Sequence, residues 1–508
     1  MEEKKINRTL GLFDTTMLVS GSMIGSGIFI VSAEMSRTVA SAGWLLVCWI
    51  LTGVITIFAA LSYGELAGMM PNVGGQYVYI KRAYNKFTAF LYGWTVFTVI
   101  QTGVIAAVAV AFAKYSSLVL PLNVTEIDIE SGKTITIPFF GEDHILMRIG
   151  NFKINYSQIL AVATIIIQTW INTRGIKSGK FIQRIFTTAK LLALFGLIVI
   201  GIYSGWGGGT FNLNFSDSFN NVTQTNFLYD SKGNVTGTET INLSGMILIG
   251  AIGAALIGSL FSSDAWNNVT FIAAEIKEPQ KNIPLGLFFG TCIVTILYVL
   301  ANVAYLCLLP LKGNYSSEGV MNLGIQFAEK ERVGAAAMMS VFGTSAQVMM
   351  AALIMVSTFG CNNGLILAGS RLFQSMAQDG LFFKKAGNLN GNAVPANSLI
   401  IQGIWASLLC LTGSYGDLLG YSTFASLIFY MITIAGIFIL RKKEPNAERP
   451  YKAFGYPIIP ALYILITFAI CVDLLYFKPG PTFIGLGIVA IGIPVYFISE
   501  KINSDKKG

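Results

Sequence analysis

Histidine is almost absent from this 508-residue chain, which contains a single one, His144, in a polar segment. Histidine is the usual proton carrier near neutral pH and a frequent metal ligand, so a histidine relay or metal centre inside the apolar segments is excluded. The chain also lacks the HExxH and GxSxG signatures of metalloproteases and serine hydrolases. We therefore expect no enzyme, no catalytic residue, no metal and no cofactor.

Cysteine and charge are scarce as well. All six cysteines fall in apolar runs, where they are interpreted as small packing residues rather than disulfide partners or metal ligands. Asp, Glu, Lys and Arg together make up 12% of the chain, which is about half the share that soluble domains carry. The chain is therefore not expected to fold as a soluble domain.

Apolar residues are abundant, since they make up 54% of the sequence and give it a mean hydropathy of +0.63. Runs long enough to cross a bilayer as helices recur along the whole length. A helix is suited to lipid because it satisfies its own backbone hydrogen bonds. We predict an all-α polytopic membrane protein, embedded in the lipid bilayer, with about 12 transmembrane helices. They cover residues 12–35, 43–68, 88–118, 156–172, 183–204, 244–274, 284–309, 335–370, 397–413, 417–440, 457–477 and 482–499.

Positive charge is unevenly distributed between the two sides of this arrangement. If the N-terminus is inside, most of the 34 lysines and arginines lie on the cytoplasmic side, as the positive-inside rule requires. The net charge of +8 is then explained by topology, and no nucleic acid partner is expected. We predict a multi-pass protein of the plasma (inner) membrane with cytoplasmic N- and C-termini. The polar segments 119–155 and 205–243 would be external loops.

The first span contains an unusual stretch, GSMIGSGIF, at residues 21–29. Glycine costs a helix interior roughly 1 kcal/mol relative to alanine, and serine competes for backbone hydrogen bonds. Unwound backbone at membrane depth is tolerated only where it is buried in protein or lines a cavity. The stretch therefore predicts either a broken helix that holds a polar ligand or, through its small-xxx-small pairs, a site of close helix packing.

The sixth span repeats this pattern at residues 255–268, where a glycine, three serines and Asp264 interrupt the apolar run. Interrupted helices at corresponding places in two halves are typical of transporters with inverted repeats and a binding site at the membrane midplane. The pair therefore favours the ligand-binding interpretation. The repeats would be residues 1–204 and 205–440, and residues 441–508 would hold two accessory helices and a cytoplasmic tail.

Four stretches resemble the amino acid-polyamine-organocation (APC) transporter superfamily, two of them in the form typical of its L-type amino acid transporter branch. They are residues 21–29, 60–85, 261–284 and 440–454. The resemblance covers nearly the whole chain. It implies a LeuT-type fold, which has a 5+5 inverted repeat and broken first and sixth helices.

Two positions depart from the family pattern. Ala265 replaces the usual glycine of an Asp-Gly-Trp-Asn-Asn core, so the shape of the break in the sixth span stays open. The loop after the third span has no cysteine, whereas heteromeric members use one there to bond a glycoprotein subunit. We therefore expect a prokaryotic-type, stand-alone member with no disulfide-linked heavy subunit.

An amino acid carries a carboxylate and an ammonium, and a broken helix offers a partner for each. The half-helix that begins near Gly27 presents N–H groups and a positive dipole end to the carboxylate. The half-helices that end near Ile24 and near Phe261 present carbonyls to the ammonium. The resemblance assigns substrate contacts to Ile24, Gly25, Ser26, Gly27 and Phe261, and Phe261 would also be the outer lid.

Three further residues of the sixth span, Ser262, Asp264 and Asn267, are candidate substrate contacts. Asp264 would either tune the site electrostatically or N-cap the second half of the broken helix. Asn267 would contact the substrate, bridge to the tenth span or serve packing only. Glu65 and Glu275, at the inner ends of the second and sixth spans, are interpreted as structural charges rather than proton carriers.

Lys190 lies inside the fifth span, roughly 9 Å deeper than Arg184 at 1.5 Å per residue. A charge at this depth usually faces the protein interior and has a partner, although a lysine stem can also reach back to the interface. By resemblance, a lysine in the matching Ala-Lys-Leu-Leu context of the L-type branch places its ammonium where sodium-coupled relatives bind sodium, near Gly25. Lys190 would then replace the ion, or support proton coupling if it loses its proton.

The predicted function is sodium-independent exchange of neutral L-amino acids across the plasma membrane by alternating access. Neutral substrates are expected because Asp264 is the only ionisable residue evident near the presumed side-chain pocket. A proton-coupled amino acid symporter is the alternative, and a cationic amino acid or polyamine antiporter is a third. A nutrient sensor or embedded enzyme on this fold is disfavoured by the short tails and the lack of catalytic motifs.

Overall fold

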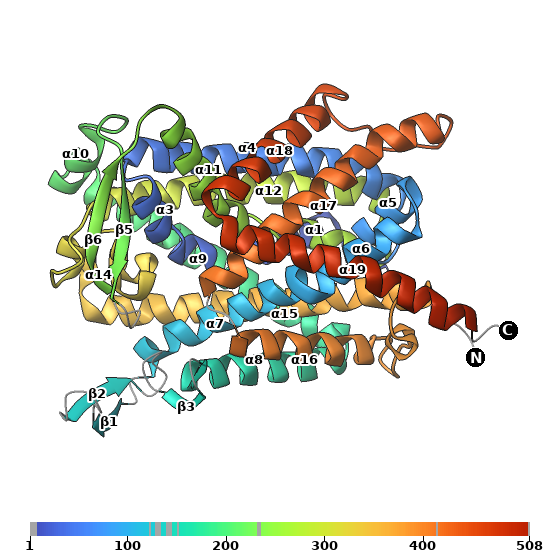
Figure 1. Cartoon of the computed structure of the whole chain (residues 1–508), viewed down its shortest axis with the longest axis horizontal. Helices are drawn as coiled ribbons and strands as arrows, with labels where there is room; N and C mark the ends of the chain where they lie inside the picture. Colours follow the sequence, from blue (N-terminus) through green and yellow to red (C-terminus); the bar gives the residue numbers. More distant parts are fainter. Residues whose placement is uncertain are drawn as a thin grey trace.

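The computed structural model describes residues 8–120, 123–127, 134–138, 145–149, 152–230, 235–412 and 415–505. Long helices lie side by side and make up most of the molecule (Figure 1). Within the described residues, ten helices are long and apolar enough to cross a membrane. They are Leu12–Ile30, Ala42–Met69, Lys86–Val119, Ile185–Gly205, Gly245–Glu275, Pro279–Leu308, Thr344–Gln378, Leu418–Lys443, Ile458–Phe477 and Pro479–Glu500.

Two further helices, α8 (Tyr156–Thr173) and α16 (Ala396–Thr412), occupy the fourth and ninth predicted spans. They pack against each other and against α15 (Thr344–Gln378) and α7 (Gln101–Val119). With these two, each of the twelve predicted spans has a helix. The prediction of an all-α polytopic membrane protein is confirmed.

Both predicted breaks are present. The first span is divided into α1 (Leu12–Met23), α2 (Gly27–Ile30) and α3 (Ser32–Thr38). The sixth is divided into α11 (Gly245–Ser262) and the 3-10 helix η2 (Trp266–Glu275). In each case the helix stops within the glycine- and serine-rich stretch, where helix propensity is lowest.

The break of the sixth span turns at Ala265, whose φ is +62°. This left-handed conformation is easy for glycine, but for other L-residues it costs roughly 1–2 kcal/mol because Cβ approaches the following carbonyl oxygen. The alanine that stands in place of the usual glycine therefore adds strain to the turn.

The eighth span differs from the prediction, because residues 335–370 do not form one helix. A short helix, α14 (Val333–Phe342), comes first, and α15 begins only after Gly343, whose φ is +75°. Gly343, Thr344 and Ser345 interrupt the apolar run at this turn, and this was the signal in the sequence that the prediction missed. The third span is also less regular than predicted, since a π-helical turn, η1 (Val96–Ile100), separates α6 (Lys86–Thr95) from α7.

The core of the bundle surrounds the broken first span. α1 packs against α12 (Pro279–Leu308), α15 and α9 (Ile176–Gly205). α11 packs against α4 (Ala42–Met69) and α17 (Tyr415–Lys443). α18 (Ile458–Phe477) and α19 (Pro479–Asp505) pack against α17.

Three antiparallel strand pairs lie in the segments predicted to be external. They are β1 (Asn123–Ile127) with β2 (Thr134–Pro138), β3 (Ile145–Ile149) with β4 (Phe152–Asn155), and β5 (Thr223–Tyr229) with β6 (Val235–Asn242). The labelled strands gather at one end of the helix bundle, whereas α5 (Gln76–Ala83) lies at the other end (Figure 1). Smaller elements are α10 (Gly209–Phe215), α13 (Val320–Leu323), η3 (Glu329–Glu331) and η4 (Lys384–Gly387).

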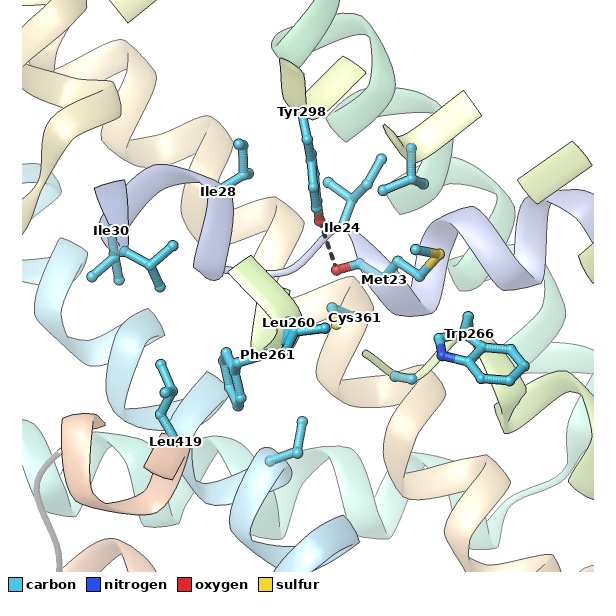
Figure 2. Packing of buried hydrophobic residues seen from close by; sticks show 14 of the residues in the cluster. Met23, Ile24, Ile28, Ile30, Leu260, Phe261, Trp266, Tyr298, Cys361 and Leu419 are labelled. Carbon is cyan, nitrogen blue, oxygen red and sulfur yellow. Dashed lines mark hydrogen bonds between the residues drawn. The ribbon is translucent and has the colours of Figure 1, made fainter. Parts of the chain in front are cut away.

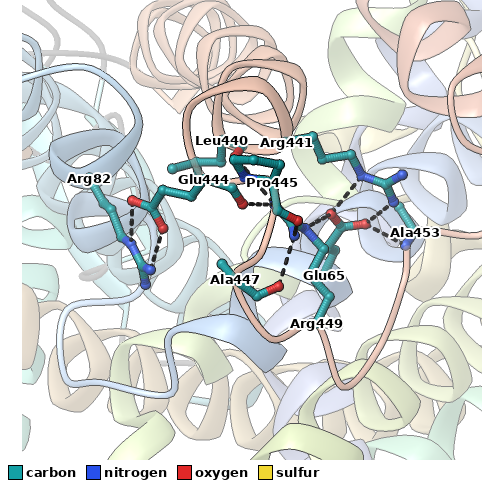
Figure 3. A network of polar contacts seen from close by, with 9 residues as sticks. All are labelled: Glu65, Arg82, Leu440, Arg441, Glu444, Pro445, Ala447, Arg449 and Ala453. Atoms are coloured by element: carbon teal, nitrogen blue, oxygen red, sulfur yellow. Dashed lines mark hydrogen bonds and ion pairs between the residues drawn. The ribbon is translucent and has the colours of Figure 1, made fainter.

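At the α5 end, the carboxylate of Glu65 is buried among cations (Figure 3). It accepts hydrogen bonds from the guanidinium of Arg441 at 2.9 and 2.6 Å and from the backbone N–H of Ala453 at 2.7 Å. Arg449 lies 3.4 Å away. These contacts fix the end of α4 to the segment after α17, as expected for a structural charge.

Candidate functional site

The break of the first span is buried, and its carbonyls accept hydrogen bonds from side chains of other helices. The ammonium of Lys190, on α9, donates to the carbonyl oxygen of Ile24 at 2.8 Å and also to that of Gly21. Lys190 is 1% exposed. The predicted contact between this lysine and the unwound backbone is therefore present, and the snorkelling alternative is wrong.

Two residues of α15 approach the same backbone from another side. The hydroxyl of Ser357 lies 3.5 Å from the carbonyl oxygen of Ile24, and the thiol of Cys361 lies 3.1 Å from that of Ser22. A helix end leaves its last carbonyls without intrahelical partners. Here α9 and α15 supply donors for them, so the unwound segment is held by specific contacts with both helices.

Tyr298, on α12, joins the two breaks. Its hydroxyl oxygen lies 2.9 Å from the carbonyl oxygen of Met23, the last residue of α1, and 3.0 Å from that of Ser262, the last residue of α11. Figure 2 shows this hydroxyl pointing at Met23 beside Ile24. The hydroxyl has one proton and donates to one of these carbonyls at a time. Because both carbonyls lie within hydrogen-bonding distance, Tyr298 connects the ends of α1 and α11. Sequence reasoning missed this residue, because a tyrosine within an apolar run carries no positional signal.

Asp264 lies in the break of the sixth span and is directed toward α17. Its carboxylate accepts hydrogen bonds from the hydroxyls of Tyr430 and, at 3.4 Å, of Ser426. The second half of the broken helix has no side-chain cap at its start. The residue at the N-cap position is Ala265, so Asp264 does not N-cap η2.

Asn267 bridges to the tenth span, which was one of its three predicted roles. Its side-chain oxygen lies 3.3 Å from the hydroxyl of Tyr430, and its side-chain nitrogen donates to Gln76 of α5 at 2.8 Å. Gln76 also accepts from Tyr92 at 3.0 Å and donates to Thr433 at 2.9 Å. This amide network orients Asn267 beside Asp264.

Gly27 is a point of close contact between the two broken helices. A Cβ atom built on Gly27 would overlap the side chain of Ser262 and approach its Cα to 2.9 Å. On Gly25, by contrast, it would lie 3.2 Å from the sulfur of Cys361. Gly27, which belongs to neither of the small-xxx-small pairs, is thus the point where α2 and α11 pack most closely. A larger residue there would separate the helices as well as obstruct a ligand.

Phe261 is buried, at 7% exposure, and its ring lies toward Leu419 of α17 (Figure 2). α11 and α17 are in contact. The side chain of Phe261 thus lies between α11 and α17, next to the break of the sixth span.

Two cavities adjoin the break of the sixth span. One lies between η1, α7, α15 and α17, and the other lies between α4, α17 and α18. Both are lined by Asp264, Ser426 and Tyr430. Asp264 is the only Asp, Glu, Lys or Arg lining either cavity, and two hydroxyls already bind its carboxylate.

Comparison with known proteins assigns the chain to a family. The sequence profile described as amino acid permease matches residues 10–495. The chain belongs to the amino acid permease family. This permease is therefore a multi-pass membrane transporter and not an enzyme, and the predicted APC resemblance is confirmed.

Individual relatives are similar over almost the whole permease. The human large neutral amino acids transporter small subunit 2 is 29% identical over 494 residues, which are 97% of this chain and 80% of that protein. Its Mus musculus counterpart is 28% identical, with coverage of 97% and 81%. The human b(0,+)-type amino acid transporter 1 is 26% identical over 478 residues, covering 93% of this chain and 84% of that protein.

Proposed function

We propose that this permease exchanges neutral L-amino acids across the plasma (inner) membrane by alternating access, without sodium. The observation that carries the proposal is the pair of adjoining helix breaks, whose terminal carbonyl groups accept hydrogen bonds from Lys190 and Tyr298. Paired half-helices at membrane depth provide oppositely polarised ends that suit a zwitterion. The names of the large neutral amino acid relatives support this substrate class.

The substrate carboxylate would bind the N–H groups at the start of the half-helix near Gly27, and its ammonium would bind carbonyls at the ends of α1 and α11. A carbonyl oxygen has two lone pairs, so Ile24 can accept from Lys190 and from the substrate once the substrate displaces the long 3.5 Å contact with Ser357. The proposed contacts are Ile24, Gly25, Ser26, Gly27, Phe261, Ser262, Asp264 and Asn267, with Phe261 as the lid. The proposed repeats remain residues 1–204 and 205–440, with 441–508 accessory.

Lys190 would replace a coupling ion. Its ammonium lies among the carbonyl oxygens of Gly21 and Ile24, with the hydroxyl of Ser357 on the far side of Ile24. Carbonyl oxygens of this kind suit a monovalent cation, and here the ammonium of Lys190 already binds them. Among the described residues no carboxylate pairs with Lys190, which favours proton-coupled symport as the second candidate, because an unpaired lysine releases its proton more easily.

A single chain is proposed to suffice for transport. Relatives are named as small subunits, but all six cysteines here are free and lie buried or half-buried in the helices. None is placed on the external surface to bond a partner. The substrate amino acid and the lipid bilayer are then the only partners that the proposal requires.

The proposed topology places both termini and η4 in the cytoplasm and the β5–β6 hairpin outside, in agreement with the opposite positions of α5 and the strands. Exposed Lys384 and Tyr229 report on the two sides. A cysteine at Tyr229 should react with a membrane-impermeant maleimide added to whole cells, and one at Lys384 should react only after permeabilisation. The reverse pattern would contradict the orientation.

Substrate class is tested by counterflow of a labelled amino acid panel in proteoliposomes. Ser, Thr, Ala, Leu and Phe should compete with labelled leucine, whereas Lys and Glu should compete weakly, because the one carboxylate lining the cavities is engaged by Tyr430 and Ser426. Empty liposomes are the control. Stronger competition by Lys or Glu than by every neutral amino acid would refute the neutral class.

A further inference from the structure

A cluster of charges, the outer clasp, connects the outer half of the first span to the third span. It consists of Arg37 on α3, Lys114 near the end of α7, and Glu331 in η3. One carboxylate oxygen of Glu331 accepts from Arg37 at 2.8 Å, and the other lies 3.1 Å from the ammonium of Lys114. Arg37 also donates to the carbonyl of Gln326 at 2.6 Å and covers the ring of Phe227. A single carboxylate thus holds two cations on two different helices.

Burial and charge pairing stabilise the outer clasp in its charged form. The side chains of Lys114 and Arg37 are 8% and 11% exposed, so separating either from Glu331 leaves a largely buried charge without its partner. Burial alone would raise the pKa of Glu331, but Lys114 and Arg37 outweigh it and hold this pKa below its ordinary value. Lys330 and Glu331 both have a left-handed backbone, with φ of 49° and 61°, which persists only where surrounding contacts impose it.

A second charge pair, the inner clasp, connects the inner half of the sixth span to the eighth. It consists of Glu275, the last residue of η2, and Arg371 of α15, which are 3.0 Å apart. The side chains are 7% and 1% exposed, respectively. The backbone carbonyl of Glu275 also accepts from the N–H groups of Thr9 and Leu10 at 2.9 and 3.1 Å. The segment before α1 is therefore fastened to the same point.

The two clasps correspond under the proposed inverted repeat. That repeat relates the first span to the sixth and the third to the eighth, with opposite directions across the membrane. The outer clasp joins spans one and three at the strand-bearing end, and the inner clasp joins spans six and eight at the other end. Each clasp therefore connects a broken span to the third span of its own repeat. The two clasps lie on opposite sides of the breaks.

We propose that Glu331 and Arg371 are positioning residues of the transport cycle, and that the outer and inner clasps separate alternately to open the site to either side. This inference rests on the proposed alternating-access function. Outward opening carries α3 away from α7 and must separate Arg37 from Lys114. Inward opening carries the end of η2 away from α15 and must separate Glu275 from Arg371. Both clasps are formed in this structure.

The sign of the effect separates this proposal from a merely structural role. A two-state equilibrium shifts toward the state that loses less when a contact is removed. Weakening the outer clasp should therefore favour the outward-open state, and weakening the inner clasp should favour the inward-open state. A general loss of stability would instead change the accessibility of the outer path and of the inner path in the same direction.

The test measures the accessibility of single reporter cysteines in proteoliposomes without any substrate. Leu419→Cys, beside Phe261, reports on the outer path, and Leu365→Cys, in the cavity beside η1, reports on the inner path. Glu331→Gln should raise labelling of the outer reporter, by an impermeant thiol reagent applied from the outer side, about threefold, as expected for a partly exposed pair. It should lower labelling of the inner reporter by the same reagent applied from the inner side. Arg371→Gln should do the reverse, by about tenfold, because the pair is buried.

Matched variants complete the experiment. Glu34→Gln, also on α3, removes a carboxylate whose ion pair goes to Lys478 rather than to α7, and should leave both rates unchanged. Arg371→Lys should restore the wild-type rates in part, and Glu275→Gln replaces Arg371→Gln if that variant fails to fold. Unchanged rates, or shifts of the same sign from both clasps, would overturn the proposal. Labelling needs no substrate, so failure of amino acid exchange would be recognised separately by counterflow.

Discussion

Replacing Lys190 by methionine is expected to lower the rate of amino acid exchange at least about tenfold, which corresponds to roughly 1.4 kcal/mol of activation free energy. Methionine keeps the unbranched apolar stem but removes the ammonium that binds the carbonyls of Ile24 and Gly21. The carbonyl of Ile24 would then keep only the long contact with Ser357 in a buried site, and the unwound segment would lose its main support. Initial rates of labelled leucine exchange in proteoliposomes measure the effect.

Two variants make the Lys190 result interpretable. Cys361→Ala removes the neighbouring thiol, which lies 3.1 Å from the carbonyl oxygen of Ser22, and should cost less than about threefold because a thiol is a weak donor. Size-exclusion chromatography should show that both variants remain monodisperse. Full activity of Lys190→Met would show that the ammonium has no part in the transport cycle.

Gly27→Ala is expected to reduce exchange more strongly, by about ten- to hundredfold. The added methyl group would overlap Ser262, and overpacking of a well-filled interior costs about 1–3 kcal/mol, which corresponds to that range of rates. The methyl group would push α2 from α11 and separate the two half-helices that form the site. The same proteoliposome assay measures the loss.

A second-site change separates packing from ligand obstruction at Gly27. Ser262→Gly removes the two side-chain atoms that the new methyl group would meet, so the Gly27→Ala/Ser262→Gly double variant should recover part of the rate. Gly25→Ala, whose methyl group would lie 3.2 Å from the Cys361 sulfur, should be milder than Gly27→Ala. Wild-type exchange by Gly27→Ala would contradict the close helix contact.

The breaks could be predicted from the sequence because their cause is local. Glycine and serine weaken a helix wherever they cluster, and both spans stop within such a cluster. Lys190 was predictable for a similar reason, since a charge in an apolar run must find a partner. In each case one stretch of sequence contains the physical reason for the structure.

The contacts between distant helices could not be predicted in this way. Nothing around Tyr298 indicates that its hydroxyl reaches the ends of both α1 and α11. Asp264 has the sequence context of a helix cap, yet Tyr430, far along the chain, supplies the donor. The outer clasp likewise depends on Glu331, which lies in a three-residue helical turn without any periodic pattern.

The dependence of exchange on sodium tests the central claim most directly. Wild-type permease in proteoliposomes should exchange labelled leucine for internal leucine at the same initial rate with sodium or with choline outside, at equal pH on both sides, because the ammonium of Lys190 already binds the carbonyls of Gly21 and Ile24. A superimposed pH gradient should leave the rate of exchange unchanged, whereas proton symport would make uptake depend on it. Exchange that requires sodium would contradict the claim that Lys190 stands in for the ion.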